Sequence, residues 1–213
     1  MPKIKIPRNS PSIDMTPMVD LAFLLVTFFM LTTKFRPEEA VQVTIPFSVS
    51  QTKLPDNVTT ISIDSAGRVF YDMDGKDARA TLFKYMAGKY KIAISDQDIA
   101  RFSVMGPFGE SMGDMKKYIE SSEEDRKVMN HATPGIPTDS TKGDELADWV
   151  NLGLSASLAD YNDKKSAGQT VNPPRFAIKA DSRAKYKIVK QVIDICQKQG
   201  VPHFNLITSM KAK

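Results

Sequence analysis

One carboxylate of this chain lies where a negative charge is costly. Fifteen of the sixteen residues at positions 18–33 are uncharged, and the exception is Asp20. A charged side chain inside hydrocarbon costs about 3 kcal/mol or more, so we expect Asp20 to face a partner subunit, the interior of a helix bundle or a water-filled path. A second interpretation places Asp20 in the first turn of a helix, where the helix dipole stabilises negative charge near a membrane surface.

Helical periodicity places one more polar group beside this carboxylate. The helical face that carries Asp20 also carries Phe23, Leu24, Thr27 and Leu31. Of these, Thr27 contributes a hydroxyl. A carboxylate and a hydroxyl on one stripe of an otherwise apolar helix indicate an ion path. The stripe offers few oxygen ligands, which favours protons over sodium as the coupling ion. No bound cofactor and no metal site are expected.

The helix that must position these groups is predicted over residues 17–34. Thr16 suits the N-cap position and Pro17 suits the first helical position, while two basic residues and a proline at positions 34–37 mark the end. At 1.5 Å per residue the apolar run spans about 25–30 Å, slightly less than a usual transmembrane helix. Flanking basic side chains can extend to the lipid headgroups and make up the difference.

A transmembrane helix explains this run better than a core helix or a signal peptide does. A core helix should carry a polar face, and only a few polar side chains interrupt this run. A signal peptide should end in a cleavage site between small residues, which does not follow here. Basic residues before the helix predict that residues 1–16 stay in the cytoplasm and that the remainder lies outside.

The sequence DMTPMVD at residues 14–20, entering an apolar run, resembles the membrane signature of the ExbD/TolR family. The alternating segment 41–46, which ends in proline, is similar to the family's strand just after the membrane. The resemblance implies a single-pass protein of the bacterial inner membrane with a periplasmic C-terminal domain, in which Asp20 carries protons for a motor driven by the proton motive force. The resemblance implies that the ion-path face is supported by Thr16, Pro17, Phe23, Leu24 and Thr27. It also implies a strand that pairs with a dimer mate or a partner peptide, formed by Val41, Val43, Ile45 and Pro46.

The resemblance also implies partners. These are an ExbB/TolQ-like multi-span pentamer around a homodimer of this chain, and a TonB-like energy transducer of an outer-membrane transport system, with peptidoglycan as a further candidate. Two alternatives stay open: a TolR-like role in envelope maintenance, and a membrane-anchored envelope-binding protein without an ion path. No nucleophile–base pair, metal cluster or phosphate loop indicates an enzyme. A net charge of +4 is too small to indicate nucleic-acid binding.

Outside the membrane the pattern predicts an α+β fold. Residues 35–57 are expected to be an extended strand and a linker, and residues 58–91 and 175–213 to form a small periplasmic β/α domain. Within that domain the predicted elements are a hairpin at 58–64 and 68–71, a helix at 79–91, strands at 175–180 and 203–208, and a helix at 183–199 with Asp181 as its N-cap. The single cysteine, Cys196, is predicted to be a core residue.

Residues 92–174 do not match the family pattern, so we predict an insertion that is mostly helical. This segment holds 14 acidic and 8 basic residues, whereas the rest of the chain holds 11 acidic and 21 basic residues. The net charge of +4 is therefore a cancellation between an acidic segment and a basic remainder. Helices are expected at about 96–104, 111–129 and 144–161, with Trp149 buried against the core or a neighbouring chain.

Overall fold

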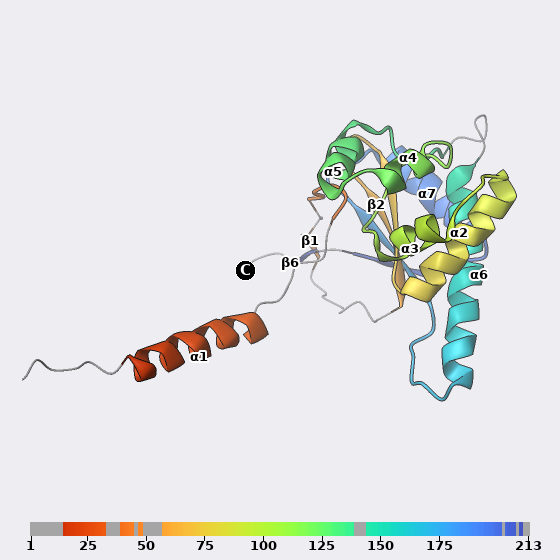
Figure 1. The fold of residues 1–213 in the computed structure, drawn as a ribbon. Helices are drawn as coiled ribbons and strands as arrows, with labels where there is room; N and C mark the ends of the chain where they lie inside the picture. Colours follow the sequence, from red (N-terminus) through yellow and green to blue (C-terminus); the bar gives the residue numbers. More distant parts are fainter. Residues whose placement is uncertain are drawn as a thin grey trace, which may run out of the picture. The chain divides into compact units, whose positions relative to one another are not determined.

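The structure is a computed structural model that describes residues 15–32, 39–44, 47–48, 57–138, 144–201, 203–207 and 209–210. The chain divides into two compact units, residues 1–37 and 38–213. In the first unit the described element is the helix α1 (Thr16–Thr32), drawn in red in Figure 1. In the second unit a small sheet and several helices make up the predicted α+β fold.

Helix α1 begins one residue earlier than the sequence predicts. The Val19 N–H donates to the Met15 carbonyl at 3.0 Å, which places Thr16 inside the first turn. The prediction that Thr16 is the N-cap is therefore wrong. Pro17 does not reveal the exact start, because the first four N–H groups of a helix have no intrahelical acceptor and proline is tolerated among them. The last two residues of the predicted helix, 33 and 34, lie outside the described residues.

The second unit is organised around a four-stranded sheet in the order β3-β2-β4-β5. Strands β2 (Val58–Ile63) and β3 (Val69–Met73) form the predicted antiparallel hairpin, and β4 (Arg175–Ala180) and β5 (Phe204–Leu206) continue the sheet in parallel to β2. Strand β4 has the predicted bounds, and it pairs with β5 in parallel. A separate parallel pair joins β1 (Phe47–Ser48) and β6 (Ser209–Met210).

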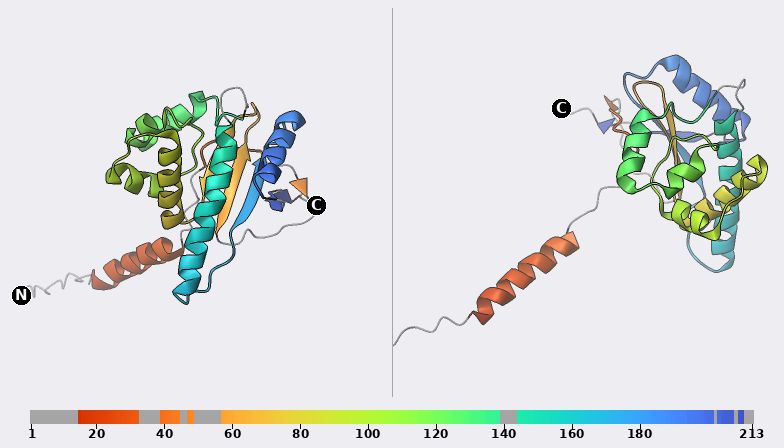
Figure 2. Two further views of the ribbon diagram at one scale, coloured as in Figure 1. Left: turned by 90° about the vertical axis from the view of Figure 1, so that its right-hand side faces the viewer. Right: turned by 45° about the horizontal axis from the view of Figure 1, so that its top comes forward.

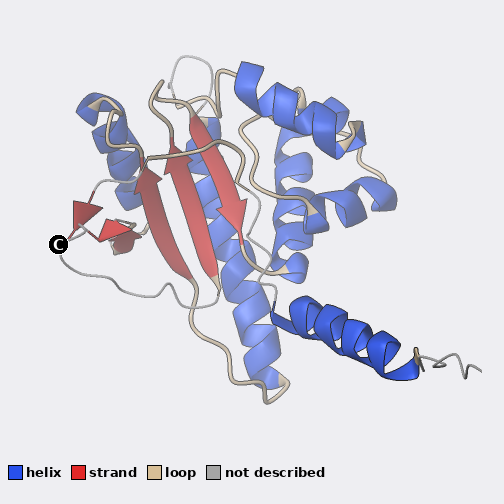
Figure 3. Cartoon of the chain, turned by 90° about the vertical axis from the view of Figure 1, so that its left-hand side faces the viewer, coloured by secondary structure: helices blue, strands red, loops and turns tan. Residues whose placement is uncertain are grey.

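Long helices cover one face of this sheet, behind the strands in Figure 3. They are α2 (Lys76–Tyr90), α6 (Glu145–Ser166) and α7 (Tyr186–Lys198). Helix α2 starts three residues before the predicted helix, because the Arg79 N–H already bonds to the Gly75 carbonyl. Cys196 of α7 is fully buried, as predicted for a core residue, and burial raises the pKa of its thiol to about 12.

The segment 92–174 is helical and shares the core of the sheet. Helix α3 (Asp96–Val104) has the predicted bounds, whereas the predicted helix 111–129 is two helices, α4 (Met115–Glu120) and α5 (Glu123–Ala132). The break falls at Ser122, whose side chain caps α5 by accepting the Asp125 N–H at 3.2 Å. Figure 2 shows these short helices gathered against the same body as the sheet. Whether the segment is an insertion relative to the family stays a prediction.

Aromatic rings from the sheet, from α2 and from segment 92–174 pack together. The ring of Trp149 lies 4.9 Å from that of Phe108 and 5.9 Å from that of Tyr71, and Phe102 stacks on Phe83 at 4.5 Å. All five side chains are fully buried or nearly so. The prediction that Trp149 is buried is therefore confirmed, and its site is the core of its own chain.

The outer edge of β3 is closed by the same segment. The Tyr71 N–H donates to the Phe108 carbonyl at 2.8 Å, the Phe108 N–H donates back at 3.1 Å, and the Ile136 N–H donates to the Val69 carbonyl at 2.9 Å. An exposed strand edge can pair with other chains, so these bonds leave β3 protected.

A buried arginine also joins the hairpin to segment 92–174. Arg79 donates to the carbonyls of Met73 and Gly106 at 3.0 and 3.1 Å, and it forms an ion pair with Asp72 at 2.8 Å. Its guanidinium lies over the ring of Phe102, 5.6 Å from the centroid. Because a buried charge must be paired and hydrogen-bonded to be tolerated, this arrangement holds the hairpin and the loop after α3 in one register.

Gly153→Ala is expected to destabilise the second unit by about 1–3 kcal/mol, the usual cost of overpacking a core. A Cβ at this position would lie 2.1 Å from Oη of Tyr71 and 3.3 Å from the Met73 side chain. The free energy of unfolding of the full-length protein, from guanidinium titration, measures the effect. Adding Tyr71→Phe removes the clashing oxygen and should recover part of the loss.

Gly88→Ala on α2 is the matched control. A Cβ there meets no atom within 4 Å, and alanine is favoured over glycine in a helix interior by about 1 kcal/mol. Equal unfolding free energies for the two alanine variants would contradict the packing argument.

Candidate functional site

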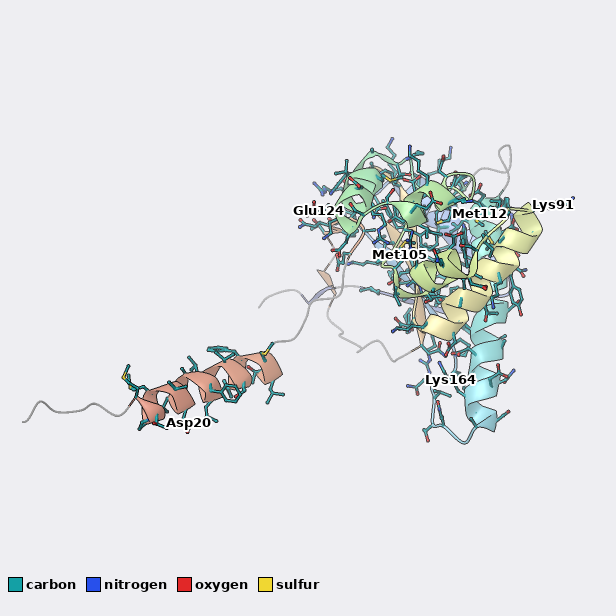
Figure 4. All side chains as sticks on the ribbon, viewed as in Figure 1. Asp20, Lys91, Met105, Met112, Glu124 and Lys164 are labelled. Carbon is teal, nitrogen blue, oxygen red and sulfur yellow. The ribbon has the colours of Figure 1, made fainter. Side chains whose placement is uncertain are left out.

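Asp20 lies on α1 among apolar side chains that are exposed in this chain. Its carboxylate points outward from the helix, as labelled in Figure 4, and it forms no hydrogen bond or ion pair within the described part of the chain. Phe23 and Leu24, which share its face, are 66% and 56% exposed. Within the described residues this carboxylate is therefore not tied to any group of its own helix.

The hydroxyl of Thr27 is hydrogen-bonded inside α1, and its role in an ion path stays a prediction. Its hydroxyl donates to the Leu24 carbonyl of the preceding turn at 3.0 Å. The hydroxyl hydrogen is therefore used inside the helix, and only the oxygen lone pairs are left to face an ion or a water molecule.

Apart from Asp20 and its threonines, the surface of α1 is apolar, and none of its residues is buried. A helix that is apolar all round is normally covered by lipid or by other helices. The described helix has 17 residues. Among the helices that the structure describes, none combines the length and the apolar character needed to cross a membrane.

A second candidate site lies in the second unit, where residues 39–44 are fastened to the end of β4. We call residues 39–44 the anchor segment. The Thr44 N–H donates to Oδ2 of Asp181 at 2.8 Å, and the Ser182 N–H donates to the Thr44 carbonyl at 2.8 Å. The other end of the segment is held by an ion pair of 2.8 Å between Lys179 and Glu39. This segment is the first described part of the chain after α1 in the sequence.

Asp181 is the centre of this anchor, and its carboxylate is strongly held in the charged form. It accepts the Arg183 N–H at 2.9 Å and the Arg183 Nε at 3.2 Å, in addition to the Thr44 N–H. The hydrogen bonds from the Arg183 side chain and backbone, helped by the one from Thr44, lower the pKa of Asp181 to about 2, although burial opposes the shift.

The prediction that Asp181 is the N-cap of α7 is wrong. Helix α7 begins at Tyr186, and its N-cap position is Lys185, which makes no side-chain capping bond. An aspartate shortly before a helical pattern usually signals a cap. Here the carboxylate is used instead by a backbone N–H that lies 137 residues away in the sequence. That pairing has no local signal in the sequence.

The strand predicted over residues 41–46 is not formed in the part that the structure describes. Val41 and Val43 are half-buried while Gln42 and Thr44 are exposed, so the alternation of side chains is present without strand pairing. Both backbone polar groups of Thr44 are taken by residues that follow β4. Ile45 and Pro46 lie outside the described residues, as does most of the predicted linker. The role of this strand in partner or dimer pairing stays a prediction.

Comparison with known proteins gives one match. A family model described as biopolymer transport protein ExbD/TolR matches residues 7–211, which is nearly the whole chain. No curated protein and no solved structure shows significant similarity to the chain.

Proposed function

The chain belongs to the ExbD/TolR family of biopolymer transport proteins, and from this we propose that it is the proton-carrying subunit of an inner-membrane motor. In this proposal α1 and its flanking residues cross the inner membrane, with the amino terminus in the cytoplasm and residues 38–213 in the periplasm. Asp20 is the group that binds and releases the proton. The work is delivered to a TonB-type outer-membrane transport system.

The observation that carries the proposal is the isolation of Asp20. It is the only charged residue of the described helix α1, and its carboxylate has no partner within the described chain. A single helix cannot enclose a proton path, so the polar groups that complete it must come from another subunit. An ExbB/TolQ-like multi-span pentamer around a dimer of this chain would supply them.

Proton binding changes which surface Asp20 prefers. The protonated acid is neutral and can face an apolar wall of the partner, whereas the carboxylate requires a polar or basic group. Alternation between the two states, with protons entering on one side of the membrane and leaving on the other, biases the relative rotation of the two subunits. Each charge that moves through 100 mV supplies about 2.3 kcal/mol, so useful work requires several transfers.

In this proposal the anchor segment transmits the force of the motor to the second unit. Backbone hydrogen bonds at Thr44 and the ion pair of Glu39 fasten the chain to the end of β4. Tension that arrives from α1 along the backbone would therefore be applied to the sheet through Asp181 and Lys179. The sheet and its covering helices would pass the force to a TonB-like partner.

Two other functions are compatible with family membership. A TolR-like subunit would use the same ion path for envelope maintenance. A membrane-anchored protein that binds peptidoglycan would need no ion path, so replacement of Asp20 would leave its function intact.

Purification in a mild detergent together with the neighbouring multi-span subunit tests the proposed assembly. The expected result is a complex whose mass corresponds to five copies of the multi-span subunit and two copies of this chain. Recovery of this chain alone, at several detergent concentrations, would count against the motor and in favour of the anchored binding protein.

Activity is expected to follow the proton gradient and not sodium. The Thr27 hydroxyl hydrogen is already bonded inside the helix, so the stripe offers a carboxylate and few further oxygen ligands, whereas a bound alkali ion needs several. Transport measured at fixed pH and membrane potential, with sodium replaced stepwise by potassium, should stay constant. A proportional loss of transport with sodium would show that sodium is the coupling ion.

A further inference from the structure

A cavity of about 350 Å³ lies among the short helices of segment 92–174. Its walls come from α3, α4 and α5, labelled in Figure 1, and from the loop after α3, with residues 39 and 40 at one side. We call it the insertion cavity. Its volume is within the range of small-molecule sites, which is about 300–1,000 Å³. The function proposed above makes no use of it.

Three hydrogen-bond donors line the insertion cavity without a partner. The guanidinium groups of Arg101 and Arg126 form no hydrogen bond or ion pair within the described parts of the chain. Asn130 is only 4% exposed, and its Oδ1 accepts a hydrogen bond from the Tyr118 hydroxyl at 3.0 Å. This bond leaves the Asn130 amide group, a donor, unpartnered among the described residues. This amide group is therefore available to donate to an acceptor oxygen of a ligand in the cavity.

The acidic residues of the same wall are mostly neutralised. Glu123 forms an ion pair with Lys127 at 2.8 Å, and Glu39 forms one with Lys179 at 2.8 Å. Glu120 is the lining carboxylate that has no pair within the described residues. The cavity therefore presents two free guanidinium groups, one free amide and one free carboxylate. This set suits a ligand with one anionic end and one cationic or N–H-bearing end.

The remaining wall is apolar. Val104, Met105, Pro107 and Ile119 line the cavity, and Met105 is labelled in Figure 4. Val104 is 64% exposed although it is a large apolar residue, so covering it with a ligand would bury surface that now faces water. An inorganic anion would use the donors and leave this wall uncovered. An organic ligand with an apolar side chain would use both.

We propose that the insertion cavity binds short peptides that end in a free carboxylate and carry an apolar last side chain. The terminal carboxylate accepts hydrogen bonds from Arg101, Arg126 and the Asn130 amide, since guanidinium and carboxylate have matching planar geometry. The apolar side chain covers Val104 and Pro107. The ammonium or amide N–H groups of the peptide face Glu120. This site is separate from the path of protons at Asp20 and does not depend on it.

Titration of the full-length protein, in a non-ionic detergent, with the dipeptide Ala-Leu tests this proposal by calorimetry. Two matched probes separate its parts: Ala-leucinamide lacks the terminal charge, and 4-methylpentanoate keeps the carboxylate and apolar body but lacks the nitrogen groups. Saturable binding of Ala-Leu, with at least about tenfold weaker binding of the amide, is expected from the loss of charge-assisted hydrogen bonds. The 4-methylpentanoate should also bind more weakly than Ala-Leu.

Variants locate the site. Arg126→Gln should weaken Ala-Leu binding by about tenfold, whereas Arg175→Gln, which removes an exposed arginine outside the cavity, should leave it unchanged. Absence of Ala-Leu binding, equal binding of the amide, or unchanged binding by Arg126→Gln would each overturn the proposal. Equal binding of 4-methylpentanoate would overturn the assignment to peptides.

Discussion

A cell whose only copy of this protein carries Asp20→Asn is expected to lose proton-driven transport completely, while the variant still assembles with its multi-span partner. Asparagine has nearly the shape of a protonated aspartate, so the packing around position 20 is preserved. It cannot release a proton at any physiological pH, so the alternation between a neutral and a charged side chain stops. Transport driven by the membrane gradient should therefore fall to the level of a strain without the gene.

Transport is expected to be lost completely because the described helix α1 has no second group that could carry the proton in place of Asp20. Every other described residue of α1 is uncharged, so no neighbouring carboxylate can take over the proton. The hydroxyl of Thr27 does not titrate in this range and is bonded to the Leu24 carbonyl. A partial loss would require a second proton carrier, which the described part of α1 does not contain.

Asp194→Asn is the control for removal of one carboxylate from an exposed site outside α1. It should transport normally. Co-purification of the Asp20→Asn protein with the partner separates loss of function from loss of assembly. Full transport by Asp20→Asn would refute the ion path and leave the anchored envelope-binding protein as the better hypothesis.

Asp181→Asn is expected to lower the free energy of unfolding of the second unit by about 2–3 kcal/mol, the usual range for losing hydrogen bonds to a buried charge. The two carboxylate oxygens accept N–H groups from both Thr44 and Arg183, and the side chain is fully buried. An amide presents an NH₂ group in place of one oxygen, so one backbone N–H would face another donor. Guanidinium unfolding of the full-length protein measures the change, with Asp163→Asn on the exposed side of α6 as the control.

The difference between wild type and Asp181→Asn should depend on pH in a defined direction. The folded-state pKa of Asp181 is lowered to about 2 from 3.8, because hydrogen bonds from Arg183 and Thr44 favour the charged form. A carboxylate with a lowered pKa stabilises the fold above its unfolded pKa, and this contribution is lost as the pH falls through the folded value. The stability difference should therefore be constant from pH 5 to 7 and shrink between about pH 4 and pH 2.

Proton-driven transport should also suffer in Asp181→Asn if the anchor segment carries force. The variant is expected to retain the ion path at Asp20 and its partner, yet to deliver less work because the Thr44 attachment is weakened. Normal transport at full expression, together with the expected loss of stability, would limit Asp181 to a structural role.

Regular elements of the second unit follow from local patterns. Strand β4 and helix α3 have the predicted bounds, and the β2–β3 hairpin forms where the sequence predicts one, at 58–64 and 68–71. Each of these is set by periodicity and turn residues within about ten positions. The predicted helix 111–129 failed because the break depends on a single serine that can lie either inside a helix or at its cap. Ser122 caps α5 here.

The amino-acid sequence alone was enough to identify Asp20 as the candidate functional carboxylate, because a single charged residue in an apolar run of sixteen can be recognised without knowing the fold. Tertiary structure decided what Asp181 does and where Arg101, Arg126 and Asn130 meet. The partner of Asp181 lies 137 residues away, and the insertion cavity exists only where three short helices pack together. Contacts of this kind arise from the packing of whole elements, and a linear pattern carries no local signal for them.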